Sequence, residues 1–279
     1  STFGESKTAG PRYVRIGFNT PVAPGSVLVR GGGQLSVLRP EAPYPGNLAD
    51  DAQWLPAERT TAHEVTRDGV NNETYALWVL PTNTVTRALR FKHVAELTDK
   101  IYHGYLGGVW LLSERMVNVA PHGVAIASRN PQNAGRLNNG ANDGTWAAWD
   151  NWEESASNTV TISPEHPETI LLVWPRAMSM TGLCALWAGF GSCEVHAYTG
   201  PAERHPREAK DEDWRTIRSF SGLENYYPLQ LGPNWLDFGQ TITNRALRLR
   251  MTGVTKEGHP HLNGNTKDGK RVWLGDLFA

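Results

Sequence analysis

Short runs of alternating apolar and polar residues, separated by Gly, Pro and polar turns, recur along the whole chain. Residues 13–18 alternate most regularly, and three glycines, Gly31 to Gly33, separate two further apolar runs in the manner of a hairpin. Uninterrupted helical periodicity is scarce. The pattern therefore predicts an all-β protein whose short strands form a sandwich or barrel. The predicted strands are 13–18, 26–30, 34–38, 73–80 and 88–93 in the first half, and 169–174, 183–187, 193–198, 214–220 and 246–251 in the second.

Four short segments occur twice, in the same order and with nearly constant spacing, which indicates an internal repeat. The clearest is Arg-Ala-Leu-Arg, which begins at Arg87 and again at Arg245. The matched segments are 25–29 with 182–186, 51–54 with 211–214, 87–91 with 245–249, and 109–111 with 272–274. The stretch 119–167 occurs once, between the copies. We therefore expect two β-sandwich modules, 1–118 and 119–279; either the first is shortened at its N-terminus or the chain is a slice of a longer protein.

Composition and charge exclude several classes of function. The formal net charge is -1, whereas nucleic-acid binders usually carry a basic balance or a basic stripe. No apolar run is long enough for a transmembrane helix, so membrane insertion is not expected. The polar start, without an initiator Met, fits a mature end after removal of a signal peptide. We therefore expect a secreted, extracellular or periplasmic protein.

The two cysteines, Cys184 and Cys193, leave two alternatives open. Two neighbouring strands could bring the sulfurs together around the turn at 187–192, and a disulfide would fit an oxidising compartment. The other alternative is a pair of buried free thiols. A zinc site built on two cysteines alone is not expected, because structural zinc takes four ligands.

The order of motifs in 124–251 resembles a galactose-binding-like module of the discoidin, or coagulation-factor type C (F5/8 type C), family. The residues that carry the resemblance are Ala127-Ser128, an Asn-Asn-Gly…Asp-Gly-Thr-Trp segment at 138–146, the strands 160–162, 170–174 and 194–198, Trp214, and Arg-Ala-Leu-Arg-Leu at 245–249. The resemblance covers most of the second module and the later two-thirds of the first. The first copy departs from the family pattern because it lacks the Asp-Gly…Thr-Trp segment.

This resemblance implies two jelly-roll β-sandwich modules in tandem. It also implies binding of sugars, or of lipid headgroups and proteins, through loops at one end of the sandwich. Members of the family are often accessory modules of larger secreted proteins, including glycan-degrading enzymes, and many hold a structural calcium near the Asp-Gly loop.

The segment that begins at Asn138 is the strongest candidate for a metal site. Calcium prefers carboxylate, amide and carbonyl oxygens, which Asn139, Asn142, Asp143 and Thr145 supply within a few residues. Asn138-Asn139-Gly140 stands where the family more often has Asp-Gly, with Asp143 as a substitute. The alternative is an ordinary Asn/Gly turn.

Eleven tryptophans are more than a core of this size needs, and large amphipathic rings also suit stacking surfaces. Trp146, Trp149 and Trp152 follow one another at intervals of three, with Asn151 and Glu153 among them. These five residues are candidate ligand contacts, because sugar rings stack on aromatic planes while their hydroxyls need polar neighbours. A step of three on a strand changes face, so at least one of the three rings should lie in the core.

Tyr226, Tyr227 and Trp235, in the loop before the last main strand, form a second candidate cluster; packing over the open end of the core is the alternative. Tyr44 is expected to be an exposed ring of the first copy. Four tryptophans within strand patterns are predicted to be core residues. They are Trp54, Trp174, Trp187 and Trp214. The arginine pairs of the repeat are expected to bond loops or acids on neighbouring strands. They are Arg87 with Arg90, and Arg245 with Arg248.

No motif of an enzyme is present: the chain has neither a nucleophile elbow nor a phosphate-binding loop, and adjacent carboxylates such as Glu153 and Glu154 point apart. Non-catalytic binding of a polysaccharide or glycan is therefore the first hypothesis, within a larger secreted protein. The alternatives are a structural or protein–protein interaction domain in a larger assembly, and an enzyme whose site the sequence does not reveal.

Overall fold

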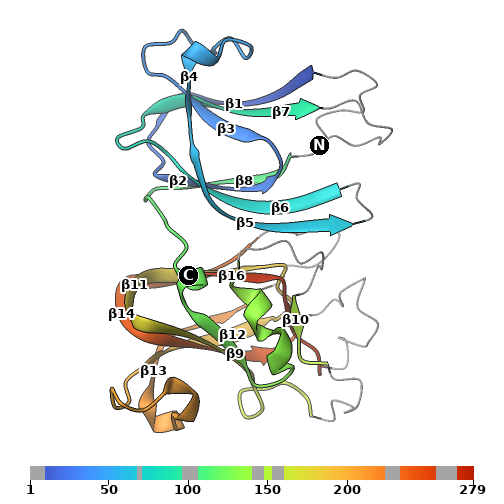
Figure 1. The fold of residues 1–279 in the computed structure, drawn as a ribbon, viewed down its shortest axis with the longest axis vertical. Coiled ribbons are helices and arrows are strands. Elements are labelled where there is room, and N and C mark those ends of the chain that lie inside the picture. The colour runs from blue at the N-terminus through green and yellow to red at the C-terminus, as the bar shows by residue number, and fades with distance from the viewer. Residues whose placement is uncertain are drawn as a thin grey trace. The chain divides into compact units, whose positions relative to one another are not determined.

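The computed structural model describes residues 10–67, 71–95, 106–139, 148–152, 160–223, 233–255 and 269–279. Their regular structure consists of antiparallel strands and short 3-10 helices, which confirms the all-β prediction (Figure 1). The described residues contain no helix that is long and apolar enough to cross a membrane. The chain divides into two compact units between Asn118 and Val119, and each unit is a sandwich with its own core.

Unit 1 packs two four-stranded sheets against each other (Figure 1). One sheet has the order β1 (Gly10–Val22), β7 (Thr86–Ala95), β3 (Gln34–Leu38) and β4 (Trp54–Pro56). The other has the order β5 (Glu58–Arg67), β6 (Asn71–Val79), β2 (Ser26–Gly31) and β8 (Leu106–Leu112). Alternation along the strands sends one side-chain face between the sheets. The buried core there is Val27, Val29, Leu35, Val37, Ala76, Trp78, Leu80, Leu89 and Phe91.

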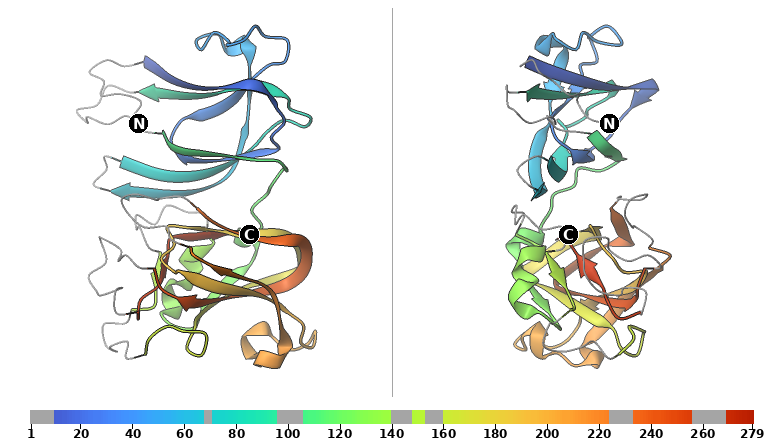
Figure 2. Two further views of the ribbon diagram at one scale, coloured as in Figure 1. Left: turned by 180° about the vertical axis from the view of Figure 1, so that it is seen from behind. Right: turned by 90° about the vertical axis from the view of Figure 1, so that its right-hand side faces the viewer.

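Unit 2 is built around two long strands, β11 (Glu168–Leu186) and β14 (Asn234–Gly253), which pair with each other and curve together (Figures 1 and 2). Register shifts after Val173 and Met180 divide the β11–β14 pairing into segments. β9 (Val124–Ala127) pairs with the first half of β11, β12 (Ser192–Tyr198) pairs with the second half of β14, and β13 (Trp214–Ser221) pairs with β12. In the other layer, the second half of β11 pairs with the first half of β14 and with β16 (Asp276–Phe278). The smaller elements are β10 (Trp149–Asp150), which pairs with β15 (Trp273–Leu274), and the 3-10 helices η1 (Asp51–Gln53) in unit 1 and η2 (Ala120–His122), η3 (Pro131–Leu137), η4 (Pro206–Glu208) and η5 (Asp211–Asp213) in unit 2.

The two units share the order of their central strands. In unit 1, β7 lies between β1 and β3; in unit 2, the second half of β14 lies between the first half of β11 and β12. In the opposite layers, β2 lies between β6 and β8, as the second half of β11 lies between β14 and β16. The pairing also aligns the Arg-Ala-Leu-Arg segments, because Leu89 faces Val37 on β3 and Leu247 faces Ala197 on β12. The repeat found in the sequence is therefore a repeat of topology.

One of the four sequence matches does not hold. Leu28 faces Trp110 in unit 1, whereas Ala185 in unit 2 faces Leu277. The counterpart of β8 is therefore β16, and 272–274 contributes to β15 instead. The false match has a simple cause: both segments are short apolar runs near the end of their copy, and composition alone does not fix register.

The four tryptophans predicted to be core residues are all buried, with exposed fractions of 2% for Trp54, 2% for Trp174, 7% for Trp187 and 9% for Trp214. Trp54 and Trp214 belong to small clusters on the outer face of their sheets, apart from the main cores. In unit 1 this cluster includes Leu48, and in unit 2 it includes Ala209, so the loops that precede the two tryptophans cover it.

Cys184 and Cys193 are buried free thiols, the second of the two alternatives. The first alternative, in which two neighbouring strands bring the sulfurs together, does not hold. Cys184 on β11 faces Trp235 and Phe278, whereas Cys193 on β12 faces Phe220 and Met251. The two sulfurs thus belong to opposite layers of the sandwich. Burial raises the pKa of Cys193 to about 12.

Candidate functional site

Residues 150–152 form a turn at the end of β10 in unit 2 that side-chain hydrogen bonds hold in place. The side-chain amide of Asn130 donates to the carbonyl oxygens of Asp150, at 2.8 Å, and Trp152, at 2.7 Å. The Asp150 carboxylate accepts from the backbone N–H of Trp152 at 2.8 Å. Asn130 itself has a φ of 46°, in the left-handed region that Asn tolerates better than most residues. Three hydrogen bonds therefore fix both the backbone of the turn and one carboxylate oxygen.

The Trp152 ring lies in this turn beside a buried arginine. The Arg271 guanidinium carbon lies 5.3 Å from the centre of the ring, and an Arg271 nitrogen lies 2.8 Å from Asp150 Oδ2. The Arg271 side chain is only 5% exposed and that of Asp150 20%, while Trp152 is half-buried. A cation near an aromatic ring is attracted by the ring quadrupole, more strongly where water is excluded. The arrangement thus holds a partly accessible indole, a carboxylate and a guanidinium in one place.

Asn151, between these residues, has a structural role. It is 1% exposed, and its amide donates to Glu168 at 3.2 Å and to the Lys270 carbonyl at 3.0 Å, while its oxygen accepts from the Val272 N–H at 3.0 Å. The prediction that Asn151 contacts a ligand at the surface is therefore wrong, because its side chain is buried. A buried amide must satisfy its donors and acceptor inside the protein, and Asn151 does so by joining β10 to the segment before β15.

Trp149 is likewise a core residue. It is 1% exposed, and its indole N–H donates to the carbonyl of Arg129 at 2.8 Å. The expectation that at least one of the three tryptophans lies in the core is confirmed, and Trp149 does not present its ring to a ligand. Trp146 and Glu153 lie outside the described residues, so Trp152 is the ring of this group that the structure offers as a contact.

Trp235, of the second predicted cluster, does not lie in the loop in which the sequence placed it. Trp235 lies within β14, opposite Cys184, and is half-buried. The segment from Asn234 to Phe238 alternates between buried and more exposed positions, as a strand does, which corrects the predicted loop. Tyr226 and Tyr227 lie outside the described residues.

The predicted calcium ligands are largely outside the described part of the chain. Asn139 is described and exposed, two residues beyond η3, whereas Asn142, Asp143 and Thr145 are not described. Among the described residues, no group of three or more His, Cys, Asp or Glu side chains converges as a metal site would. The calcium site thus stays a prediction.

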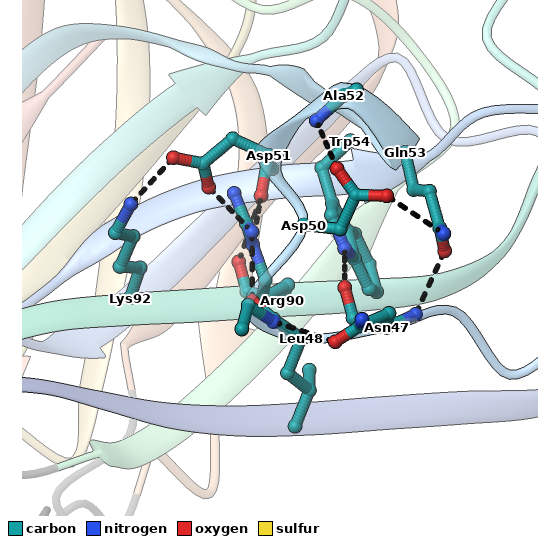
Figure 3. Close-up of polar contacts among 11 residues, drawn as sticks. Asn47, Leu48, Asp50, Asp51, Ala52, Gln53, Trp54, Arg90 and Lys92 are labelled. Atoms are coloured by element: carbon teal, nitrogen blue, oxygen red, sulfur yellow. Dashed lines mark hydrogen bonds and ion pairs between the residues drawn. The ribbon is translucent and has the colours of Figure 1, made fainter.

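A further polar cluster is repeated in both units, on the outer face of the sheet that carries Arg-Ala-Leu-Arg. In unit 1, Arg90 lies over the Trp54 ring, 5.0 Å from its centre, and 2.7 Å from Asp51, whose other oxygen binds Lys92 at 2.7 Å (Figure 3). Arg90 also donates to the carbonyl of Leu48 and to Ser36. The hydrogen bonds that Lys92 and Arg90 donate to Asp51 hold the pKa of this carboxyl below its usual range, and the bond from Lys92 has the larger effect.

Unit 2 repeats the arginine, the tryptophan and the aspartate of this cluster, whereas the residues beside them differ. Arg248 lies 4.9 Å from the centre of the Trp214 ring and 2.7 Å from Asp211, as Arg90 does with Trp54 and Asp51. Where unit 1 has Ser36, unit 2 has His196. The prediction that the repeated arginines bond loops and acids holds for Arg90, Arg245 and Arg248. Arg87 instead donates to the Asn19 carbonyl on β1. Sequence alone did not show that Arg90 and Arg248 also stack on the tryptophan of their own unit.

The His196 ring is 4% exposed and has defined partners on both nitrogens. Nδ1 lies 2.8 Å from an Arg248 nitrogen, and Nε2 lies 3.2 Å from Glu194. Arginine can only donate, so Nδ1 is the acceptor and Nε2 carries the proton that faces the carboxylate. Burial, followed by the charge of Arg248, holds the pKa of His196 below its usual value. The ring is therefore a neutral link between an arginine and a glutamate.

The chain matches no family model and no curated protein. Similar solved structures include a family 32 carbohydrate-binding module from Clostridium perfringens in complex with galactose, at 9% identity and a TM-score of 0.37 over 57% of this chain and 93% of that one. A fucolectin from striped bass (Morone saxatilis) serum has 10% identity and a TM-score of 0.34, over 97% and 82% of the two chains. A two-domain protein of unknown function from Bacteroides fragilis has 12% identity and a TM-score of 0.35, over 97% and 84%. At such low identities and TM-scores, the likenesses do not assign an activity to this chain.

Proposed function

We propose that the protein binds carbohydrate without catalysis, through the 150–152 turn of unit 2. The observation that carries the proposal is the half-buried Trp152 ring, fixed beside Arg271 and Asp150. An indole plane suits the apolar C–H face of a pyranose, and the carboxylate accepts hydrogen bonds from sugar hydroxyls. We further propose that the chain is part of a larger secreted protein that acts on polysaccharides.

The rigidity of the turn supports binding because little conformational entropy is lost when a ligand arrives. Asn130, Asp150 and Arg271 hold Trp152 from both the backbone and the ring side. A single ring with few polar partners gives a weak site. Binding to repeated sugars on one polymer would raise the apparent affinity.

The test is a glycan array followed by calorimetry with Trp152→Ala. We expect loss of binding by about tenfold or more, the upper range for losing an aromatic contact. The matched control is Trp110→Ala, which removes another half-buried indole, in unit 1. Circular dichroism establishes that both variants fold. Retention of the wild-type glycan profile by Trp152→Ala would remove the proposed site.

We also propose a structural calcium at Asn139, Asn142, Asp143 and Thr145. The oxygen-rich side chains of this segment support it. Adding calcium to chelator-treated protein should raise the melting temperature, because a ligand of the folded state stabilises it. The variant Asp143→Ala should lose this shift. Equal melting temperatures of wild-type protein with calcium and with chelator would refute the site.

A specific observation favours a second function, protein–protein interaction. In unit 1 the core-facing Val14, Ile16 and Phe18 of β1 are only partly buried, whereas their counterparts in unit 2 are 1% to 2% exposed. Those counterparts are Ile170, Leu172 and Trp174. The difference has a visible cause: β9 pairs with this edge in unit 2, and among the described residues β1 pairs only with β7. An edge strand of this kind can accept an extended partner segment.

A peptide with the sequence of 122–129, which contains β9, provides the test. We expect it to slow hydrogen exchange of the β1 amides and to leave those of β13 unchanged. A scrambled peptide of the same composition is the control. Unchanged exchange of β1 at millimolar peptide would exclude this edge as an acceptor.

A further inference from the structure

Tyr44 is the most exposed aromatic side chain among the described large hydrophobic residues, at 45%. It lies in a turn closed by a 2.8 Å hydrogen bond from the Gly46 N–H to the Pro43 carbonyl. The turn is anchored on the sheet a few residues later, where the Trp54 indole donates to Asn47 at 2.8 Å. An exposed ring on an anchored turn is a ready contact surface for a ligand.

The Tyr44 ring is positioned by β1 and β7. The Arg87 guanidinium lies 4.2 Å from the ring centre, and Arg87 also donates to the Asn19 carbonyl at 3.2 Å. A Cβ added at Gly17 would lie 2.7 Å from the Tyr44 hydroxyl oxygen, so the phenol fits there only because Gly17 has no side chain. Arg15 extends from β1 to the same turn, with contacts of 3.4 Å and 3.5 Å to the Pro45 and Gly46 carbonyls.

Arg15 and Arg87 have no carboxylate partner in the described part of unit 1. The acids of the segment 39–53, which carries Tyr44, already have partners. Asp51 pairs with Arg90 and Lys92, each at 2.7 Å, Glu41 lies 3.8 Å from Arg39, and Asp50 accepts from Ala52 and Gln53. Two guanidinium groups beside an exposed ring therefore present donors and positive charge without compensation. Guanidinium groups bind carboxylate and sulfate-like oxyanions through parallel hydrogen bonds.

Unit 2 does not have this surface, although it shares the scaffold. Arg245, the counterpart of Arg87, lies 5.0 Å from the centre of the Tyr198 ring, which is only 5% exposed, and donates to the Pro201 and Arg204 carbonyls. The register places Leu171 at the position of Arg15 and Val173 at the position of Gly17. The exposed ring, the second arginine and the glycine thus occur together in unit 1 and are absent together at the equivalent positions of unit 2.

We propose that unit 1 carries a separate binding site for an anionic saccharide, formed by Tyr44, Arg15 and Arg87. The ring stacks on the apolar face of the sugar, and the two guanidinium groups bind its carboxylate or sulfate. The site extends the proposed carbohydrate binding to a second ligand class and shares no residue with the 150–152 turn. The two proposals therefore fail independently.

The experiment measures binding of the full chain to polygalacturonate and to its methyl ester, and to dextran sulfate and dextran, by affinity electrophoresis and calorimetry. We expect binding to at least one anionic polymer, weaker binding to its neutral partner, and a decline with added salt. Arg15→Gln and Arg87→Gln should each lower the affinity about fivefold, and Tyr44→Ala by up to about tenfold.

The matched control is Arg176→Gln, which removes the same charge from an exposed position of unit 2 and should bind as the wild type does. Trp152→Ala should also keep this binding, whatever it does to neutral glycans. Arg15 is exposed, so its variant keeps the test valid even if replacement of Arg87 disturbs the fold. Equal affinity for charged and neutral polymers, or equal losses with Arg176→Gln and Arg15→Gln, would overturn the site.

Discussion

Acidification is expected to destabilise the protein through His196. The ring accepts a hydrogen bond from Arg248 on Nδ1, and a second proton would have to enter at that nitrogen, facing a cation. Around the ring stand Glu194 on its own strand, Arg248 and Arg250 on β14, and Thr216 on β13. Glu194 favours the charged ring, but burial and the arginines outweigh it, which places the pKa of His196 below its usual value.

The sign follows from proton linkage. Between the lowered pKa of the folded state and the ordinary value of about 6.5, the unfolded chain binds more protons than the folded one, so stability rises with pH in this window. The contribution of His196 is fully present above about pH 6.5 and is lost on acidification through the window. One group contributes at most about 1.4 kcal/mol per pH unit, and that is the largest slope His196 can add.

The counterpart in unit 1 supplies the control. Ser36 occupies the equivalent position and accepts from Arg90 at 3.0 Å, without a titrating group. The variant His196→Ser places that arrangement in unit 2. Urea unfolding of wild type and variant, followed by circular dichroism from pH 5 to 8, measures the free energy of unfolding of each. The free energy of unfolding of the wild type minus that of the variant should fall as the pH falls, because only the wild type loses the contribution of His196. A difference that is independent of pH would refute the argument.

Two further predictions test the core. A Cβ at Gly25 would lie 2.3 Å from the backbone carbonyl carbon of Glu114, whereas one at Gly32 meets nothing within 4 Å. In the same urea assay, Gly25→Ala should therefore lower the free energy of unfolding by about 2 kcal/mol or more, and Gly32→Ala should lower it far less. Equal effects of the two substitutions would contradict this packing. Burial raises the pKa of both thiols, so iodoacetamide at pH 8 should leave Cys184 and Cys193 unmodified in the folded protein. In urea without reductant, the same reagent should label both, as mass spectrometry would show. Failure to label either cysteine in urea would indicate a disulfide.

Strand alternation and the Arg-Ala-Leu-Arg repeat were enough to predict the all-β fold and the tandem sandwiches. They did not predict that β11 and β14 each run through both layers. Residues 169–174 and 183–187 have the pattern of two separate strands, because the exposed Pro175 to Ala177 between them interrupts the apolar alternation. Pairing with β14 on both sides of this stretch makes one curved strand, and pairing between distant segments has no local sequence signal.

The candidate site was predictable only in part. The spacing of Trp146, Trp149 and Trp152 showed that one ring must be buried, but β10 has two residues, too few for alternation to show which ring faces outward. The groups that fix Trp152 lie far away in sequence. Asn130 and Arg271 are brought to the turn by η3 and by the segment before β15, and neither stands in a motif.

The two copies separate the parts that maintain the scaffold from the parts that can differ. The arginine that stacks on a tryptophan and binds an aspartate is retained as Arg90 and as Arg248, so this cluster belongs to the fold itself. The residues beside it differ: Ser36 and His196, Gly17 and Val173 occupy equivalent positions. A change that keeps the shared cluster intact alters the surface at little cost to the fold. Specific binding is therefore to be sought at positions where the copies differ, and these differences expose Tyr44 in unit 1 and bury Tyr198 in unit 2.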